Sequence, residues 1–175
     1  LPISLYGASK LACEALISAF CSTFGMRSWI FRFANIVGER GTHGVLVDFI
    51  RKLEANPKEL EILGSGRQRK SYLEVRDCVD GMISSIERSR DRVNVFNIGS
   101  ADSVAVTEIA DVVVEKMNLE GVRYRYTGGI EGRGWKGDVK TMLLSIEKME
   151  KLGWKPRHNS RQSIEAAVEA LLKQR

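Results

Sequence analysis

The first pattern along the chain is that of an amphipathic helix. Over residues 6–24 the apolar positions recur at spacings of three and four, at Leu11, Ala12, Ala15, Leu16, Ala19 and Phe20. We expect Gly25 to end this helix, because glycine readily takes the left-handed backbone found at helix C-termini. The next run, SWIFRFANIVG at residues 28–38, is short, apolar and aromatic, which predicts one buried strand.

The remaining sequence continues to alternate between the two patterns. Further strands are predicted at 60–63, 71–75, 93–98 and 122–127, and further helices at 45–53, 77–86, 106–117, 145–152 and 160–172. The glycine-dense segment after residue 127 is interpreted as a loop, and Asp77 is expected to be a helix N-cap. Such alternation predicts an α/β fold with largely parallel strand pairing.

Composition narrows the class of protein without fixing a function. The chain is 43% hydrophobic and 28% charged, which is typical of a globular domain, and no apolar run approaches the ~18 residues of a membrane span. We therefore expect no membrane partner and a cytoplasmic location. Three cysteines without paired spacing, Cys13, Cys21 and Cys78, are expected to be buried or half-buried thiols. The net charge of +5 suits an anionic small molecule as well as nucleic acid.

The stretch LYGASKL carries the first candidate chemistry. Tyr6 and Lys10 are four residues apart, so on a helix they lie on one face. A phenol has an ordinary pKa near 10 and acts as a base at neutral pH only if nearby cations stabilise the phenolate. A lysine at this spacing supplies one such cation. The spacing by itself leaves a chance pair equally open.

Other polar and aromatic residues have simpler interpretations. His43 and His158 stand alone in loop sequence, so neither a metal site nor a serine/histidine triad is expected. Asp138 is interpreted as an acceptor within a loop, and the three tryptophans as packing residues: Trp29, Trp135 and Trp154. No strand leads through G-x-G-x-x-G into a helix with an acidic residue about 20 positions on, so a complete dinucleotide site is not expected within these residues.

A family resemblance extends along the chain in order. PISLYGASKLACEALISAF resembles the catalytic helix of the extended short-chain dehydrogenase/reductases, specifically the NAD-dependent nucleotide-sugar epimerases and dehydratases. FRFANIVGERG is similar to the family's R-x-x-N-V-Y-G, and ILGSGRQRKSYLEVRDCVDGM to its G-D-G-x-Q-x-R-D-F-x-x-V-x-D-x-V. VLVDFIRKL, VFNIGS, GRGWKGDV and LGWKP also resemble family segments. Within the family, the UDP-glucose 4-epimerase-like branch is the most similar.

The resemblance implies an architecture. The chain would form the C-terminal part of a Rossmann-type parallel-sheet domain plus a small α/β substrate-binding subdomain. Residues 1–44 would belong to the NAD-binding domain and 45–175 mainly to the substrate region, with 68–100 contributing to the Rossmann sheet. The cofactor loop is expected in sequence before residue 1. We therefore expect the chain alone to be inactive, to expose apolar surface where further parallel strands of the Rossmann sheet would pack, and to associate. We expect the full-length protein to be a homodimer.

The resemblance also implies a reaction. Tyr6 would take a proton from a sugar hydroxyl while NAD accepts hydride from the same carbon, most simply C4. The resulting keto-sugar would turn and be reduced from its other face. Lys10 would hold the nicotinamide ribose and favour the Tyr6 phenolate, and Phe33 would lie where the chain passes the nicotinamide.

The resemblance also assigns contacts with a UDP-sugar to individual residues of this chain. Asn35 would contact the diphosphate, and the base would be bordered by Val45, Leu46 and Phe49. Many relatives have arginine at the positions of Lys70 and Trp135, so Lys70 would act as a point charge and Arg133 is assigned to the diphosphate.

Two other functions stay open at this point. A nucleotide-sugar dehydratase or decarboxylase would keep the Tyr6 and Lys10 pair and add acidic groups near the sugar. A non-catalytic nucleotide-sugar-binding or nucleic-acid-binding domain would keep the motif without the reaction. The scattered basic residues, without a basic stripe interleaved with aromatic residues, favour no nucleic-acid partner.

Overall fold

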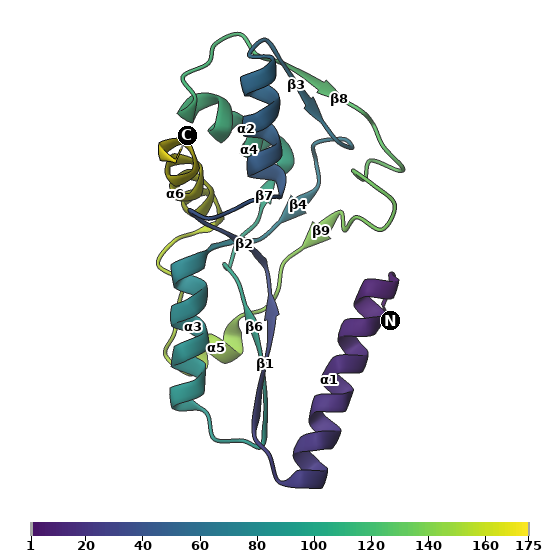
Figure 1. Cartoon of the computed structure of the whole chain (residues 1–175), viewed down its shortest axis with the longest axis vertical. Helices are drawn as coiled ribbons and strands as arrows, with labels where there is room; N and C mark the ends of the chain where they lie inside the picture. The colour runs from purple at the N-terminus through teal and green to yellow at the C-terminus, as the bar shows by residue number, and fades with distance from the viewer. Residues whose placement is uncertain (1, 175) are drawn as a thin grey trace.

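A computed structural model describes residues 2–174. The elements follow one another as α1 (Leu5–Phe24), β1 (Ser28–Phe33), β2 (Asn35–Val37), α2 (Val45–Ala55), β3 (Glu59–Ile62), β4 (Arg69–Lys70), β5 (Tyr72–Glu74), α3 (Val75–Arg88), β6 (Val93–Ile98), β7 (Val104–Ala105), α4 (Val106–Lys116), β8 (Arg123–Tyr126), β9 (Thr141–Met142), α5 (Glu147–Lys151) and α6 (Ser160–Lys173). The predicted α/β alternation is confirmed (Figure 1).

Most strand pairs are parallel, as predicted. β1 pairs with β6, β2 with β5, β3 with β8 and β4 with β9, all in parallel, and only β4 with β7 is antiparallel among the described residues. The glycine-dense loop after β8 leads into the short strand β9 and not into a helix, so its glycines do not form the dinucleotide-binding turn.

The single strand predicted over 28–38 is wrong, because the chain changes its pairing partner at Ala34. The backbone N–H of Ala34 donates to the Ile98 oxygen (2.9 Å), whereas that of Asn35 donates to the Ser71 oxygen (3.1 Å). β1 therefore continues alongside β6, and β2 begins alongside β5. This switch sets Asn35 at the start of a new strand pair.

Two hydrophobic cores form around these sheets. One gathers apolar residues of α2, β3, α4 and α6 around the fully buried Ile50, Leu60 and Ile109. The other is centred on Phe96 and includes Leu73, Met149 and Trp154. Each fully buried large apolar side chain contributes about 1.5–3 kcal/mol relative to exposure, so both cores are substantial.

Helix α1 begins and ends as its sequence suggests. The Ser4 side chain accepts a hydrogen bond from the Gly7 N–H (3.1 Å), and Gly25 has a left-handed φ of 66°. Cys21 is the one buried residue of α1, and an ion pair between Arg32 and Glu14 (2.5 Å) ties the helix to β1. Hydrogen bonding from Arg32 holds the pKa of Glu14 below its usual value.

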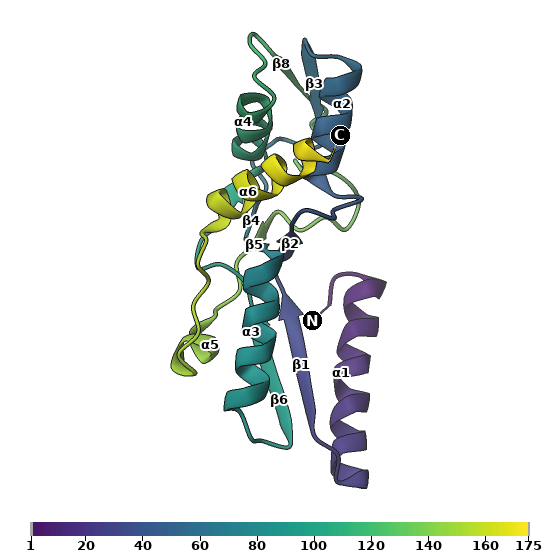
Figure 2. The same cartoon turned by 60° about the vertical axis from the view of Figure 1, so that its left-hand side comes forward.

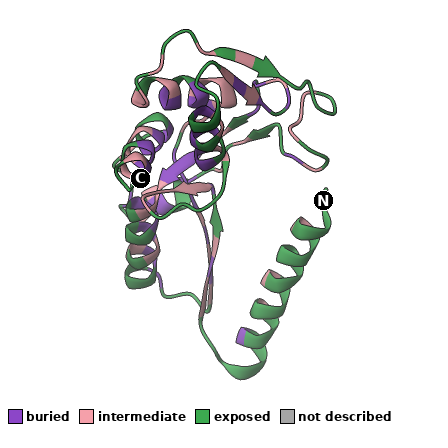
Figure 3. Ribbon diagram, turned by 45° about the horizontal axis from the view of Figure 1, so that its top comes forward, coloured by how far each residue is buried: buried purple, intermediate pink, exposed green. Residues whose placement is uncertain are grey.

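Most of α1 is exposed and stands to one side of the β1–β6 pair, opposite α3 (Figures 1 and 2). Figure 3 shows it as an almost wholly exposed helix away from the buried core. Cys13 is exposed too, so the expectation that all three cysteines are at least half buried is wrong. The exposed apolar side chains of α1 are Leu5, Leu11, Leu16, Ile17, Phe20 and Phe24. The chain therefore exposes apolar surface on α1.

We expect this surface to drive self-association of the 175-residue chain. Sedimentation in a reducing buffer should show a mass that rises with concentration, because apolar area of this kind is removed from water when copies associate. The double change Leu16→Lys with Phe20→Lys should return the chain to a monomer. The control Ser22→Lys, on the side of α1 away from Leu16 and Phe20, should reduce association much less than the double change, and equal association of all three proteins would contradict the prediction.

Candidate functional site

A cavity of about 600 Å³ opens beside the start of β2. Its wall is formed by α2, by β2, by the first residue of β5 and by the loop that precedes β9. Five of the residues predicted to contact substrate line it: Asn35, Val45, Leu46, Phe49 and Lys70. Tyr6, Lys10, Phe33 and Arg133 are not among its lining residues. Pockets of this size ordinarily accommodate small molecules.

Asn35 has one side of its amide fixed by the fold. Its Nδ2 donates to the Ser71 backbone oxygen (3.2 Å), which also accepts the Asn35 backbone N–H. An amide flipped by 180° would face this oxygen with its own oxygen, so the orientation is set. No other hydrogen bond of the Asn35 side chain occurs within residues 2–174, which leaves Oδ1 and one N–H for a ligand.

Lys70 is already paired. Its Nζ donates to Asp138 (2.6 Å), whose carboxylate is 2% exposed and also accepts the Gly134 N–H (3.0 Å). The structure thus shows Asp138 as the loop acceptor predicted from the sequence. Beside them, burial raises the pKa of Tyr72 to about 12, with a further contribution from the Asp138 charge, so this phenol is neutral at physiological pH.

The predicted packing role of Trp135 is wrong. Its side chain is 59% exposed and lines the cavity, with Lys70 Nζ 5.2 Å from the centre of its ring. It sits in the irregular loop before β9, where no helix or strand turns the side chain into a core. Trp154, in contrast, is 7% exposed in the second core, as predicted.

Gln68 is a lining residue that the sequence interpretation missed. Its side chain is almost fully buried, and Nε2 donates to the Leu63 backbone oxygen (3.0 Å). The Oε1 atom is buried with no hydrogen-bond partner. An unsatisfied buried acceptor costs about 1–3 kcal/mol. The sequence indicates a role for Gln68 only through the segment GSGRQRKSY, which resembles a family motif that has glutamine at this position.

Arg133 lies outside the cavity wall, in the loop that crosses the turn after β3. Its Nε is buried without a partner, and its guanidinium lies 3.8 Å from Glu131. A tight turn precedes it: a side chain at Gly129, where φ is +56°, would place its Cβ 1.8 Å from the Arg133 oxygen. Only glycine fits there. The assignment of Arg133 to a diphosphate stays a prediction.

Tyr6 and Lys10 do lie on one face of α1. The Lys10 Nζ is 5.4 Å from the centre of the Tyr6 ring, which is the arrangement that their spacing predicts. Tyr6 is 72% exposed. Phe33, at the end of β1, is also exposed and stacks on Phe31 with ring centres 6.1 Å apart. All three predicted cofactor residues are therefore open to a ligand.

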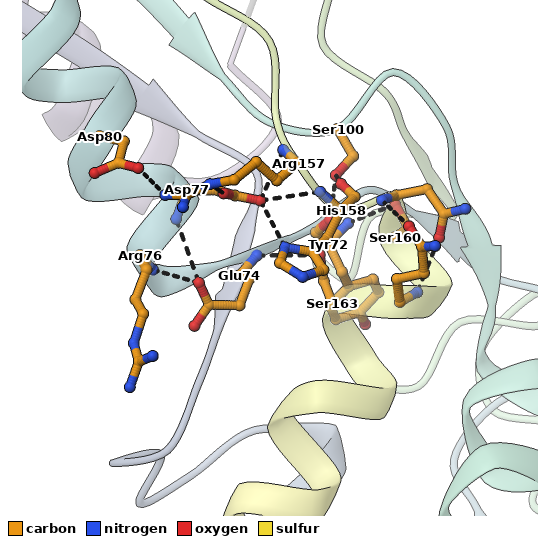
Figure 4. Close-up of polar contacts among 12 residues, drawn as sticks. Tyr72, Glu74, Arg76, Asp77, Asp80, Ser100, Arg157, His158, Ser160 and Ser163 are labelled. Atoms are coloured by element: carbon orange, nitrogen blue, oxygen red, sulfur yellow. Dashed lines mark hydrogen bonds and ion pairs between the residues drawn. The ribbon is translucent and has the colours of Figure 1, made fainter.

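A second polar cluster surrounds Asp77, and it corrects two predictions (Figure 4). The N-cap of α3 is Glu74, whose carboxylate accepts the N–H groups of Arg76 and Asp77. The Asp77 side chain is instead buried and accepts four hydrogen bonds of 2.9–3.1 Å: two from Arg157 and two from His158. His158 is therefore not isolated. Burial opposes ionisation, but the bonds from His158 and Arg157 hold the pKa of Asp77 below its usual value.

The sequence model of the NAD dependent epimerase/dehydratase family matches residues 1–99, which is more than half of the chain. The chain belongs to this family. The resemblance found in the sequence is thereby confirmed. Within residues 2–174, no group of acidic, histidine or cysteine side chains could hold a metal ion, and no helix is long and apolar enough to cross a membrane.

Individual family members are similar over nearly the whole chain. A putative UDP-glucose 4-epimerase of Methanocaldococcus jannaschii is 29% identical over 171 residues, which are 95% of this chain and 53% of that protein. The GDP-mannose 3,5-epimerase of Arabidopsis thaliana is 32% identical over 161 residues, 89% of this chain and 40% of that one. The chain thus spans about half the length of the curated relatives it matches.

Solved structures of family members share the fold. A crystal structure of UDP-galactose 4-epimerase has a TM-score of 0.86 and 38% identity, covering 99% of this chain and 55% of that one. The UDP-glucose 4-epimerase of Thermotoga maritima, solved with UDP-glucose, has a TM-score of 0.81 and 27% identity over the same shares. These likenesses confirm the partial Rossmann-type fold. The roles of single residues and the domain boundaries at 44 and 45 stay predictions.

Proposed function

We propose that this chain supplies the catalytic helix and the nucleotide-sugar cavity of an NAD-dependent UDP-sugar 4-epimerase. The observation that carries the proposal is the 600 Å³ cavity in which Asn35, Lys70 and the apolar side of α2 meet. The names of its relatives support this choice, since the solved structures at 38% and 27% identity are 4-epimerases of UDP-sugars. We propose a homodimer and a cytoplasmic location for the whole protein.

The cavity offers groups suited to each part of a UDP-sugar. Val45, Leu46 and Phe49 provide an apolar surface for the base. The free N–H of Asn35 can donate to a phosphate oxygen, and the Lys70 ammonium has three donors, of which Asp138 occupies one. Lys70 can therefore bind phosphate without leaving Asp138. A sugar hydroxyl could be received by the free Asn35 Oδ1.

The pair on α1 fits a redox cofactor by its exposure and its charge. Lys10 would bind the nicotinamide ribose, and Tyr6 and Phe33 would border the ring. When bound, NAD accepts and returns hydride at the sugar carbon. Tyr6 takes the hydroxyl proton and later gives it back, and the nearby Lys10 ammonium favours the phenolate that does so.

Binding of UDP to the purified chain tests the proposal. Trp135 lines the cavity, so UDP should change tryptophan emission, and the change should be largely lost in Trp135→Phe. Calorimetry should give a dissociation constant that Asn35→Ala weakens by about fivefold, the value of one net hydrogen bond. The control Asn97→Ala, outside the cavity, should bind as the wild type does. No binding at about 1 mM UDP, or binding of RNA instead, would contradict the proposal.

We expect the 175-residue chain to bind UDP without turning over UDP-sugars when NAD is added. Family members are about twice its length, and turnover needs a cofactor held in place as well as a bound sugar. Product analysis with UDP-galactose as substrate checks this expectation. Measurable conversion to UDP-glucose by the purified chain would contradict it.

A further inference from the structure

Strand β5 has a strand on one edge only. It pairs in parallel with β2, Leu73 lying opposite Ile36, and within residues 2–174 no strand lies on its other edge. That edge is closed by side-chain hydroxyl groups. Ser160 Oγ accepts the Tyr72 N–H (3.1 Å), Ser163 Oγ accepts the Glu74 N–H (3.1 Å), and Ser100 Oγ donates to the Tyr72 oxygen (2.6 Å) (Figure 4).

Water cannot replace these hydroxyl groups as hydrogen-bond partners, because the serines are buried. Ser160 and Ser163 have no exposed surface, and Ser100 is 1% exposed. Buried backbone N–H groups must find a partner, and here the partner is a serine where a sheet would ordinarily supply a carbonyl. The three bonds fall on residues 72 and 74, which are the alternate positions that face one edge of a strand.

The start of α6, which carries two of the serines, is itself held firmly. Asn159 and Gln162 form a capping box, and the Ser160 N–H donates to Asp102 (2.9 Å). Just before α6, the buried Asp77 carboxylate accepts hydrogen bonds from the backbone N–H groups of Arg157 and His158. The serines are thus fixed points to which β5 is attached.

The position of β5 decides the geometry of the cavity. Tyr72 lines it, and Asn35 is its register partner across the β2–β5 pair. Both hydrogen bonds that orient Asn35 end on the oxygen of Ser71, the residue before β5. Ser71 is in turn tied to Ser100 by its Oγ, which donates to the Ser100 oxygen and accepts the Ser100 N–H.

We propose that Ser160 and Ser163 are positioning residues for the cavity: from α6 they take the place of a neighbouring strand on β5 and thereby hold Tyr72 and Asn35 where a ligand meets them. Neither serine lines the cavity, so neither contacts the ligand. The identity of that ligand, UDP or a UDP-sugar, rests on the proposed function. The attachment of β5 to α6 is independent of the proposed function.

The attachment is tested first without ligand, on the double variant Ser160→Ala with Ser163→Ala. Amide hydrogen exchange at Tyr72 and Glu74 should accelerate by about tenfold or more, and the Asn35 side-chain amide signal should shift in the ¹⁵N spectrum. The matched control is Ser85→Ala, since Ser85 is equally buried and its hydroxyl bonds only within α3, to the Met82 oxygen (2.8 Å). Its exchange at Tyr72 and its Asn35 signal should match the wild type. Unchanged exchange in the double variant, or an unmoved Asn35 signal, would overturn the proposal.

The link to binding is tested with UDP. The double variant should bind UDP about fivefold more weakly, and Ser85→Ala should bind normally even if it is as strongly destabilised. In an Asn35→Ala background the same serine changes should have a clearly smaller effect than in the wild type, because part of their action passes through Asn35. Fully additive losses would overturn the proposal. If the double variant does not fold, the two single variants serve in its place. If the wild type itself does not bind UDP, the proposed function fails and the exchange and Asn35 measurements still decide the positioning role.

Discussion

Replacing Asp77 by alanine should lower the free energy of unfolding by about 3 kcal/mol, which for a chain of this size is a fall in Tm of roughly 10 °C. The change removes the acceptor of four hydrogen bonds. Two of the donors are the backbone N–H groups of Arg157 and His158, and each costs about 1–3 kcal/mol if left unsatisfied. Urea unfolding followed by circular dichroism measures the effect.

Asp80 provides the matched control. It lies one helical turn from Asp77 and is paired with the same Arg157, but its side chain is 51% exposed. Exposed ion pairs contribute less than about 1 kcal/mol, so Asp80→Ala should shift the urea midpoint only slightly. Equal losses from the two changes would show that the ion pair with Arg157, and not the buried backbone acceptor, stabilises this corner.

The same carboxylate predicts a pH dependence of stability. Because the pKa of Asp77 is lower in the folded chain than in the unfolded one, its contribution is present above the unfolded value of about 3.9. It is lost as pH falls through the folded pKa. The stability difference between wild type and Asp77→Asn should therefore shrink as pH falls below about 4. A difference that grows as pH falls below about 4 would contradict this assignment.

In the complete enzyme, Tyr6→Phe should lower turnover of UDP-galactose by about a thousandfold, the usual contribution of a general base. The substitution removes only the hydroxyl that exchanges the proton, and Tyr6 does not line the cavity. UDP affinity should therefore stay within about twofold of the wild type. Steady-state kinetics and calorimetry separate the two quantities.

Two further variants sharpen this test. Lys10→Met should lower turnover and also weaken NAD binding, because Lys10 is proposed to hold the ribose as well as to favour the phenolate. Cys13→Ser, at another exposed position of the same helix, should leave both unchanged. Full activity of Tyr6→Phe would remove Tyr6 from the mechanism and leave the cavity assignment standing.

Local patterns predicted those parts of the fold that local interactions determine. The three-and-four spacing predicted α1, and Gly25 ended it, since a left-handed residue at that place needs no distant partner. The strand at 28–38 was predicted as one element because its apolar run is continuous. Its division at Ala34 depends on Ile98 and Ser71, which no window around residue 34 contains.

The same limit applies to the site residues. Asp77 precedes an apolar helical pattern and therefore looked like an N-cap, but its partners at 157 and 158 lie about 80 residues along the chain. Trp135 looked like a packing residue because tryptophan usually is one, whereas its loop has no element to pack against. Asn35, Lys70 and the α2 residues were found through motif similarity, and the structure brings them to one cavity.

The hydroxyl-closed edge of β5 also constrains the order in which the protein folds. The two serines that accept its N–H groups, Ser160 and Ser163, are 88 and 89 residues away in sequence, so these N–H groups stay unpaired until α6 has docked. Contacts this distant form late, because a long loop must close before they contribute. A chain cut or stalled before residue 160 would present an unpaired strand edge to its neighbours. Docking of α6 thus removes an open strand edge from solvent.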